Sequence, residues 1–334
     1  MNTFIQAPQR NTSDAMGSNL LSIIIINYNG KSFLSECLTS IQEHVKCEYE
    51  VIVVDNASVD GSCEYLRVHF PQVRLIEGSI NQGFSRGNNL GAKSAKGNLL
   101  LLLNNDTRLI SSLTPAINEF DKDKQLGVLG CRMSYGDGTF QPSVGFEHTP
   151  LSIVLSWVGI GGFSFAPRIF KRVDDEKSHY AIPNEAAWVS GAFLMTRRDL
   201  WEQQGGLDDN FFMYVEEVDY CKRVRMAGYR VAYTPNVKII HYEGGGRAWI
   251  GEDALVESMR SYVTFVKKYY GKFSLLIMRS GLTVVMLLRS FAYYCMMLLR
   301  ISVLSREKAR ASIKAAKTLW KVDLFVVKQN RLAN

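Results

Sequence analysis

The first hundred residues alternate short apolar runs with longer amphipathic segments. Buried strands are predicted where apolar residues follow one another without a helical period, at 22–27, 50–55, 73–77 and 99–103. Helices are predicted between them, over 31–44, from 60 onward and over 85–95. Strands that are apolar throughout and alternate with helices are typical of a parallel sheet covered by helices on both faces. The fold class is therefore α/β, of the Rossmann-like kind.

The pattern weakens in the middle of the chain. Residues 135–183 are rich in glycine and aromatic side chains, so we expect them to be loop-rich and to contribute to binding of an acceptor substrate. Regular structure is expected again at 188–196, in a helix over 215–227, and in two strands at 229–233 and 237–240.

Length and composition indicate a globular protein in three parts. Of the 334 residues, 47% are hydrophobic and 21% are charged, which excludes wholesale disorder. We expect a polar N-terminal extension (1–20) without the features of a signal peptide, a catalytic domain (21–250) and a helical C-terminal region (251–334). The six cysteines form no Cys-x-x-Cys pair, which favours reduced, buried thiols in a cytoplasmic protein.

Polar side chains cluster where the predicted strands end. These clusters are Asn27-Tyr28-Asn29, Asp55-Asn56, Asn81-Gln82-Gly83 and Asn104-Asn105-Asp106. In parallel sheets, ligands bind at the carboxyl ends of the strands. Asp106 and a distant histidine at another strand end, His241, could hold a divalent cation on a diphosphate. Alternatively, Asp106 belongs to a polar turn that caps the next helix, and His241 is structural.

A pair of acids, Glu216 and Glu217, begins the predicted helix over 215–227. The helix dipole favours acids there, which is a sufficient structural explanation. The preceding aromatic loop, 211–214, could also frame a pocket and raise the pKa of a carboxylate for general-base work. Asp219 and Arg223 are four residues apart on one helix face, and we expect them to pair. No dinucleotide or Walker glycine pattern is present.

The segment 273–304 is strongly apolar but is interrupted by Arg279, Arg289 and Arg300. Its uncharged stretches are shorter than the roughly 20 residues that a membrane span needs. At about 100° per residue the three arginines fall within roughly 80° of one another. This pattern predicts a helix that lies in the membrane interface.

A second predicted C-terminal helix has an apolar stripe flanked by lysines. The stripe contains Ile313, Ala316, Trp320, Leu324 and Val327. Most of the net charge of +7 lies in this tail, which suits anionic lipid headgroups. Alternatively, the two helices pack on the catalytic domain or on a second subunit. Nucleic acid is not expected as a partner, because no nucleic-acid-binding motif accompanies the charge.

Six segments in order resemble a family 2 inverting glycosyltransferase with the GT-A fold, close to the rhamnosyltransferase-like branch. They are IIINYNG (24–30), VVDNASVDGS (53–62), NQGFSRGNN (81–89), LLLNNDT (101–107), SGAFLM (190–195) and GGLDDNFFMYVEEVDY (205–220). The resemblance extends from about Leu21 to Arg247.

The resemblance implies a site for a nucleotide-diphosphate sugar. Its donor-binding residues would be Asn27, Tyr28, Asp55, Asn81, Asn105 and Asp106. Asp55 would contact the nucleoside, and Asp106 with His241 would hold Mg²⁺ or Mn²⁺ on the diphosphate. Asn104 stands in place of the first acid of the family's metal motif, which removes one anionic ligand.

The resemblance also implies that Glu217 is the general base, where the family usually has the Asp of a Glu-Asp pair. Because Glu is one methylene longer than Asp, Glu216 remains a rival for this role. A single carboxylate would take the proton of the acceptor hydroxyl as its oxygen attacks the anomeric carbon, and the configuration would invert.

The expected function is transfer of a sugar, with rhamnose as one candidate, from a dTDP- or UDP-sugar to a lipid-linked or polysaccharide acceptor in cell-surface glycan assembly. We expect a peripheral or monotopic enzyme on the cytoplasmic face of the plasma membrane, in contact with an anionic membrane surface. One alternative is a sugar-nucleotide nucleotidyltransferase, although the segment 27–31 is a poor triphosphate loop. The other is a non-catalytic nucleotide-sugar-binding or membrane scaffold protein.

Overall fold

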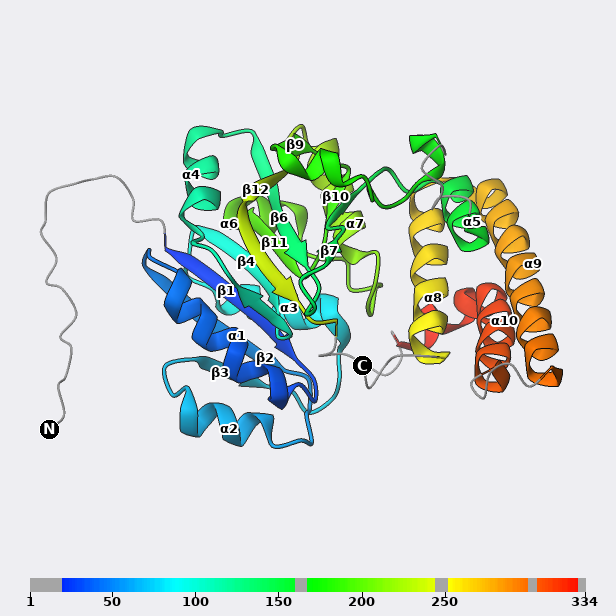
Figure 1. Ribbon diagram of the computed structural model, residues 1–334, viewed down its shortest axis with the longest axis horizontal. Helices are drawn as coiled ribbons and strands as arrows, with labels where there is room; N and C mark the ends of the chain where they lie inside the picture. Colours follow the sequence, from blue (N-terminus) through cyan, green and yellow to red (C-terminus); the bar gives the residue numbers. More distant parts are fainter. Residues whose placement is uncertain (1–19, 160–166, 244–251, 300–304, 330–334) are drawn as a thin grey trace, which may run out of the picture.

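The computed structural model describes residues 20–159, 167–243, 252–299 and 305–329. Almost all of the predicted N-terminal extension lies outside these residues. A large mixed sheet forms one side of the molecule, and a layer of long helices stands beside it (Figure 1).

One half of the sheet is parallel, as predicted. Its strands follow the order β3-β2-β1-β4 and span Arg74–Glu77 (β3), Tyr49–Asp55 (β2), Leu21–Asn27 (β1) and Leu99–Asn104 (β4). The order continues β11-β6-β12-β5, with the bounds Phe193–Arg197, Leu126–Ser134, Arg230–His241 and Thr107–Leu109. β11 runs antiparallel to both of its neighbours, and β5 runs antiparallel to β12 at the edge.

Helices cover both faces of this sheet. One apolar core lies between the sheet and α1 (Lys31–His44), α2 (Ser62–His69) and α4 (Thr114–Lys122). A second core lies on the other face, under α3 (Gly83–Ser94), α6 (Arg198–Gln204) and α7 (Glu216–Met226). Alternate residues of β1 serve the two cores, with Ile23 on one side and Ile24 on the other. Burial on both faces explains why the strands are apolar without interruption.

The described part of the segment predicted to be loop-rich contains two short strands, one α-helix and two 3-10 helices (Arg168–Phe170 and Lys177–Ala181), and two further short strands follow it. β7 (Phe140–Gln141) pairs with β6, β9 (Asn184–Glu185) pairs with β12, and β8 (Val144–Gly145) pairs with β10 (Trp188–Val189). The helix α5 (Pro150–Val158) starts with a capping box formed by Thr149 and Ser152.

Two boundary predictions were wrong. The two strands expected between 229 and 240 form the single strand β12, which stays paired with β6 across an irregularity between Thr234 and Lys238. The segment expected at 188–196 is divided between β10 and β11, which belong to different sheets. β12 contains Pro235 and a local register shift, both of which a strand tolerates. Sequence alone does not distinguish such an irregular strand from two strands joined by a turn.

Three long helices follow the sheet: α8 (Glu252–Tyr269), α9 (Gly271–Leu298) and α10 (Ser305–Gln329). Figure 1 shows them packed side by side with α5 at one end of the molecule. Arg279 and Arg289 share one side of α9, as predicted, but that side faces the other helices. The Arg279 guanidinium lies 5.9 Å from the ring centre of Trp320 on α10, and that of Arg289 lies 5.4 Å from Trp157 on α5.

The predicted apolar stripe of α10 is displaced around the helix. Ala316 is buried, but Ile313 and Trp320 are exposed, and the buried side contains Ala315 and Leu319. Small alanine side chains allow α10 to lie close against α8 and α9, so packing against neighbouring helices decides which side is covered. The structure does not describe the side chains of Leu324 and Val327.

Candidate active site

The carboxyl ends of β1, β2 and β4 meet in a row of hydrogen-bonded polar side chains. The Asn27 amide donates to Asp55 Oδ2 at 2.7 Å, and its own oxygen accepts from Asn105 at 2.8 Å. Asp55 Oδ1 accepts from the backbone N–H of Ser58 at 2.7 Å. Asn27, Asp55 and Asn105, three of the six predicted donor-binding residues, are buried. In this structure they hydrogen-bond to one another and fix the shape of the sheet edge.

The other two predicted nucleoside contacts lie nearer the surface. Tyr28 and Asn81 are partly exposed. The Asn81 side chain accepts from the backbone N–H of Gly83, and the Gly83 carbonyl accepts from Asn56 at the end of β2. Asn81 is thereby tied to the strand end that carries Asp55. The roles of these residues toward a nucleoside stay predictions.

Asp106 and His241 come together at the far side of the same edge. β12 and β5 pair so that His241 lies opposite Thr107, and Asp106 Oδ1 is 3.3 Å from His241 Nε2. The side-chain nitrogen of Asn104 is also 3.3 Å from His241 Nε2. The sequence-predicted pair is therefore one cluster, with the neutral Asn104 beside it.

Gln141 is a neighbour of this cluster that the sequence did not indicate. It is buried on the two-residue strand β7, and its amide nitrogen lies 3.1 Å from His241 Nδ1 and 2.8 Å from Glu243 Oε1. A partner on Nδ1 fixes the orientation of the imidazole. No periodic pattern surrounds Gln141, and only the pairing of β7 with β6 brings it to the edge of the sheet.

The donor set at Asp106 and His241 fits a small divalent cation. Two ligands at a right angle, each with a bond of about 2.1 Å, are separated by about 3 Å, close to the observed spacing. The described residues hold no group of three or more His, Cys, Asp or Glu side chains around such a point.

Glu216 and Glu217 have different environments at the start of α7. Glu217 is partly exposed, and burial raises its pKa to about 7 against the lowering effect of backbone N–H groups at the helix N-terminus. Glu216 is 4% exposed, and one of its oxygens has no hydrogen-bond partner. Burial, Glu217 and then Glu257 of α8 raise the pKa of Glu216 well above its ordinary value. Glu217 is therefore the accessible carboxylate of the pair.

The loop before these acids is strained. Tyr214 and Val215 both have positive φ, 70° and 71°, which is uncommon for residues with a side chain and unfavourable for a β-branched one. Hydrogen bonds hold the loop from two sides. The Phe212 carbonyl accepts from the backbone of Phe84 on α3, and the Met213 carbonyl accepts from Ser261 on α8.

Gly191 connects the acids to the side of the edge that carries Asp106 and His241. A side chain at Gly191 would contact Phe84 at 3.4 Å and Glu217 Cβ at 3.8 Å, so Glu217 lies directly beside it. The next residue, Ala192, accepts a hydrogen bond from the backbone of Asn104. The antiparallel strand β11 thus brings Glu217 toward the same strand ends as Asp106 and His241.

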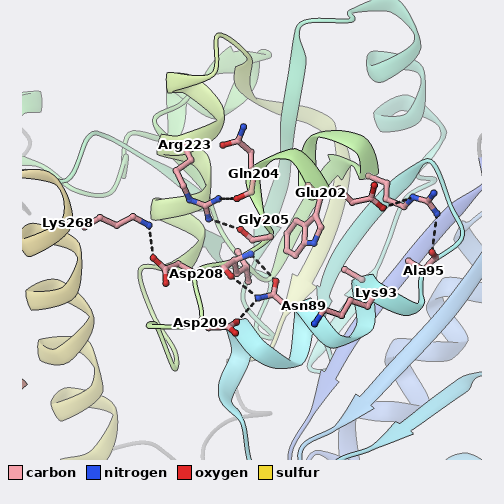
Figure 2. Close-up of a pocket in the computed structure, with 15 residues that line it drawn as sticks. Asn89, Lys93, Ala95, Glu202, Gln204, Gly205, Asp208, Asp209, Arg223 and Lys268 are labelled. Atoms are coloured by element: carbon pink, nitrogen blue, oxygen red, sulfur yellow. Dashed lines mark hydrogen bonds and ion pairs between the residues drawn. The ribbon is translucent and has the colours of Figure 1, made fainter. Parts of the chain in front are cut away.

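A cavity of about 910 Å³ lies elsewhere, between α3, α6, α7 and α8 (Figure 2). None of the predicted site residues lines it. Arg223 pairs with Asp219 at 2.8 Å, as predicted, and also donates to the carbonyls of Gln204 and Gly206 on the cavity wall. These residues support the turn before the active-site loop.

The sequence that forms this sheet edge matches a known protein family. The family model for Glycosyl transferase family 2 matches residues 22–201, which contain the ends of β1, β2 and β4 but not Glu217 or His241. The chain belongs to glycosyltransferase family 2. This membership confirms the family predicted from the sequence, and it disfavours the nucleotidyltransferase alternative.

Among curated family 2 relatives, the chain is 25% identical over 243 residues to an N-acetylglucosaminyl-diphospho-decaprenol L-rhamnosyltransferase of Mycobacterium tuberculosis. The match covers 68% of this chain and 77% of that protein. A rhamnosyltransferase of Escherichia coli is 24% identical over 236 residues, covering 67% and 83% of the two chains. A hexosyltransferase of low-salt glycan biosynthesis in Haloferax volcanii is 25% identical over 228 residues, covering 66% of each.

Solved structures confirm the predicted glycosyltransferase fold. A mannosyltransferase of Pyrobaculum calidifontis, solved with GDP-Man and Mn²⁺, superposes with a TM-score of 0.52 at 16% identity and covers 96% of this chain and 90% of its own. GalNAc-T7, solved with UDP, GalNAc and Mn²⁺, gives 0.55 at 17% identity and covers 77% of this chain and 49% of its own.

Asp106→Asn should weaken Mn²⁺ binding, because it removes the carboxylate of the Asp106–His241 cluster. We expect a loss of roughly tenfold or more in the presence of a nucleoside diphosphate, measured by electron paramagnetic resonance of free Mn²⁺. Asn104→Asp is the matched variant and should tighten binding. Equal Mn²⁺ affinity in the wild type and Asp106→Asn would remove Asp106 from the metal site.

Glu216→Gln should change how stability depends on pH. A raised carboxyl pKa means that the native state holds the proton more tightly than the unfolded chain. Wild-type stability should therefore decrease as pH rises above the ordinary value of 4.5. Gln cannot ionise, so Glu216→Gln should lose less stability between about pH 5 and pH 8 in urea denaturation. Glu43→Gln, at an exposed position, should follow the wild type, and identical curves for all three proteins would contradict the environment described for Glu216.

Proposed function

We propose that this family 2 glycosyltransferase performs an inverting, metal-dependent sugar transfer with Glu217 as its general base. The observation that carries the proposal is the environment of Glu217. It is a partly exposed carboxylate with a pKa raised to about 7, beside Gly191 and on the strand-end side that also holds Asp106 and His241. A base with a pKa near the working pH is the most effective for proton transfer.

The reaction needs only this one carboxylate. Glu217 takes the proton of an acceptor hydroxyl while the hydroxyl oxygen attacks the anomeric carbon from the face opposite the leaving nucleoside diphosphate. A single displacement inverts the configuration, and no covalent intermediate with the protein forms. Glycoside hydrolysis differs because it typically uses a pair of carboxylates on opposite sides of the bond. Glu216 is buried and favours its protonated form, which makes it a poor rival for the role.

Asp106 and His241 would hold Mg²⁺ or Mn²⁺. The cation would supply positive charge against the diphosphate that leaves. The two solved relatives with UDP or GDP-Man and Mn²⁺ support this assignment. Asp106 contributes one negative charge and Asn104 contributes none, so the cation would keep more of its charge for the donor.

The donor and acceptor classes follow from the named relatives. Two of them are rhamnosyltransferases, and one acts on a diphospho-decaprenol lipid, so we propose a dTDP- or UDP-sugar donor, with rhamnose as one candidate, and a lipid-linked acceptor. Cell-surface glycan assembly is the corresponding process. Because a polyprenyl acceptor stays in the bilayer, the enzyme would work at a membrane, on the cytoplasmic face where nucleotide sugars are made.

Donor binding tests the proposed function directly. Calorimetry with UDP-, dTDP- and GDP-sugars should show binding of one donor class with Mn²⁺ or Mg²⁺, and loss of that binding when a chelator is added. The metal dependence is expected because Asp106 and His241 would contact the diphosphate through the cation. Absence of binding by every donor to folded protein with metal present would favour the scaffold alternative.

Glu217→Gln should lower kcat by roughly 10²–10⁴-fold and leave donor affinity unchanged. The wild-type rate should fall as pH decreases below about 7, because the base must be deprotonated. Initial rates with a soluble acceptor analogue over a pH series measure both effects. Glu216→Gln is the matched control and should lose much less activity. The reverse order of the two variants would assign the base to Glu216.

A further inference from the structure

The outer side of α9 is apolar along its length except at the exposed Ser280. Ten large apolar residues between 273 and 299 are half to three-quarters exposed: Phe273, Leu276, Ile277, Val284, Leu287, Leu288, Phe291, Tyr294, Leu298 and Leu299. At about 100° per residue all but the last, which caps the helix, fall within roughly 120° of one another. From Phe273 to Leu298 this face is roughly 38 Å long. We call it the α9 face.

Arg279, Arg289 and Ser290 of α9 are on the inner side, and its exposed polar residues are Lys272 and Ser280. Arg279 is 9% exposed, Ser290 is 8% exposed and donates to the Ala309 carbonyl of α10, and Arg289 stacks on Trp157 of α5. A helix at a water-facing surface has the opposite arrangement, with arginines outside and leucines inside. The exposure of apolar side chains on α9 therefore indicates a surface that is covered by an apolar medium.

The neighbours of α9 continue this surface on both sides. On one side Gly281 lies close to Val154 of α5, and α5 adds the exposed Leu151 and Val158. On the other side Trp320 of α10 donates its indole N–H to Thr283 at 2.9 Å while its ring stays 47% exposed. Tryptophan with its polar end satisfied and its ring exposed is typical of the boundary between lipid and water.

Next to this apolar surface, α10 is basic. Its exposed charged residues between 306 and 321 comprise one acid, Glu307, and six basic residues: Arg306, Lys308, Arg310, Lys314, Lys317 and Lys321. Basic side chains beside an apolar helix face match the anionic headgroups and acyl chains of a membrane. A second copy of this chain, related by a twofold axis, would instead bring equal positive charges toward each other.

We propose that α9, flanked by α5 and α10, docks this protein on an anionic lipid bilayer, with the α9 face in the acyl region and the helix parallel to the membrane plane. Only the purpose of this docking, which is to bring Glu217 to a lipid-linked acceptor, rests on the proposed function. It keeps the interfacial helix expected from the sequence, but Arg279 and Arg289 point into the protein.

The parallel orientation follows from the packing of α10. By length and composition α9 alone, among the described helices, could cross a bilayer. However, α10 runs antiparallel along it, with contacts at Ser290–Ala309 and Thr283–Trp320. The exposed Arg310, Lys314 and Lys317 lie between these two contacts. If α9 crossed the bilayer, these three cations would lie at its centre, where basic side chains are strongly disfavoured.

The first experiment measures, by sedimentation, binding of the full chain to phosphatidylcholine vesicles in which about one lipid in three is the anionic phosphatidylglycerol. The double variant Leu287→Glu/Phe291→Glu should bind at least tenfold more weakly, because it places two charges on the α9 face. The matched control is Val59→Glu/Val68→Glu, at exposed positions next to and on α2, and it should bind as the wild type does. Lys317→Gln/Lys321→Gln should lose roughly tenfold on anionic vesicles and nothing on neutral ones.

Wild-type binding by Leu287→Glu/Phe291→Glu would overturn the proposal. The proposal would also be overturned if the wild type did not bind vesicles but formed a dimer in sedimentation, and Leu287→Glu/Phe291→Glu abolished that dimer. The α9 face would then be the interface with a second copy of the chain. Donor calorimetry of the same variant should be unchanged. Failure of donor binding in the wild type would therefore refute the proposed function without affecting the vesicle result.

The second experiment tests the orientation. Nitroxide labels at Ser280→Cys and Leu298→Cys, in a protein whose partly exposed Cys47, Cys63 and Cys295 are serine, report depth in the bilayer by power saturation. Equal depths within a few ångströms support a helix parallel to the membrane. The two positions are 18 residues apart, so a depth difference approaching roughly 27 Å would show a spanning helix and overturn the orientation.

Discussion

Burial of the central sheet on both faces is the constraint on which the rest of the structure depends. β1, β2 and β4 have helices on each side, so their central side chains are apolar, and polar side chains occur at the strand starts, where Ser22 donates to Glu50, and at the strand ends. Polar groups are consequently concentrated at the carboxyl edge, where Asn27, Asp55 and Asn105 satisfy one another. The same constraint that builds the core therefore also places the polar edge that we propose binds the donor.

The proposed base, Glu217, is held differently from the strand-end residues. Glu217 follows a loop with two consecutive positive-φ residues, and such a conformation persists only when its surroundings enforce it. Here α3 holds the loop through Phe84 and α8 holds it through Ser261. Because α8 also brings Glu257 near Glu216, the C-terminal helices contribute to the electrostatics of the acid pair.

The C-terminal helices thus have two sides with different tasks. The inner side of α8 contacts α7 through Tyr269, whose hydroxyl donates to the buried Asp219, and through Lys268, which pairs with the same carboxylate. The outer side of the layer carries the α9 face. A rigid connection of this kind would keep Glu217 at a fixed height above a membrane, which is the geometry that a lipid-linked acceptor requires.

The sequence by itself determined the α/β fold, the family and the strand ends that carry the polar clusters, because apolar periodicity and strand-end polarity are local properties of the chain. It also identified Asp106, His241, Glu216 and Glu217 as candidates. Only the tertiary structure decided that Asp106 and His241 are neighbours, that Gln141 lies against His241, and that Glu217 is more accessible than Glu216. It also decided that the arginines of α9 face inward. These outcomes depend on strand order, on β11 running antiparallel and on how helices pack, and each is a contact between residues distant in sequence that no local pattern encodes.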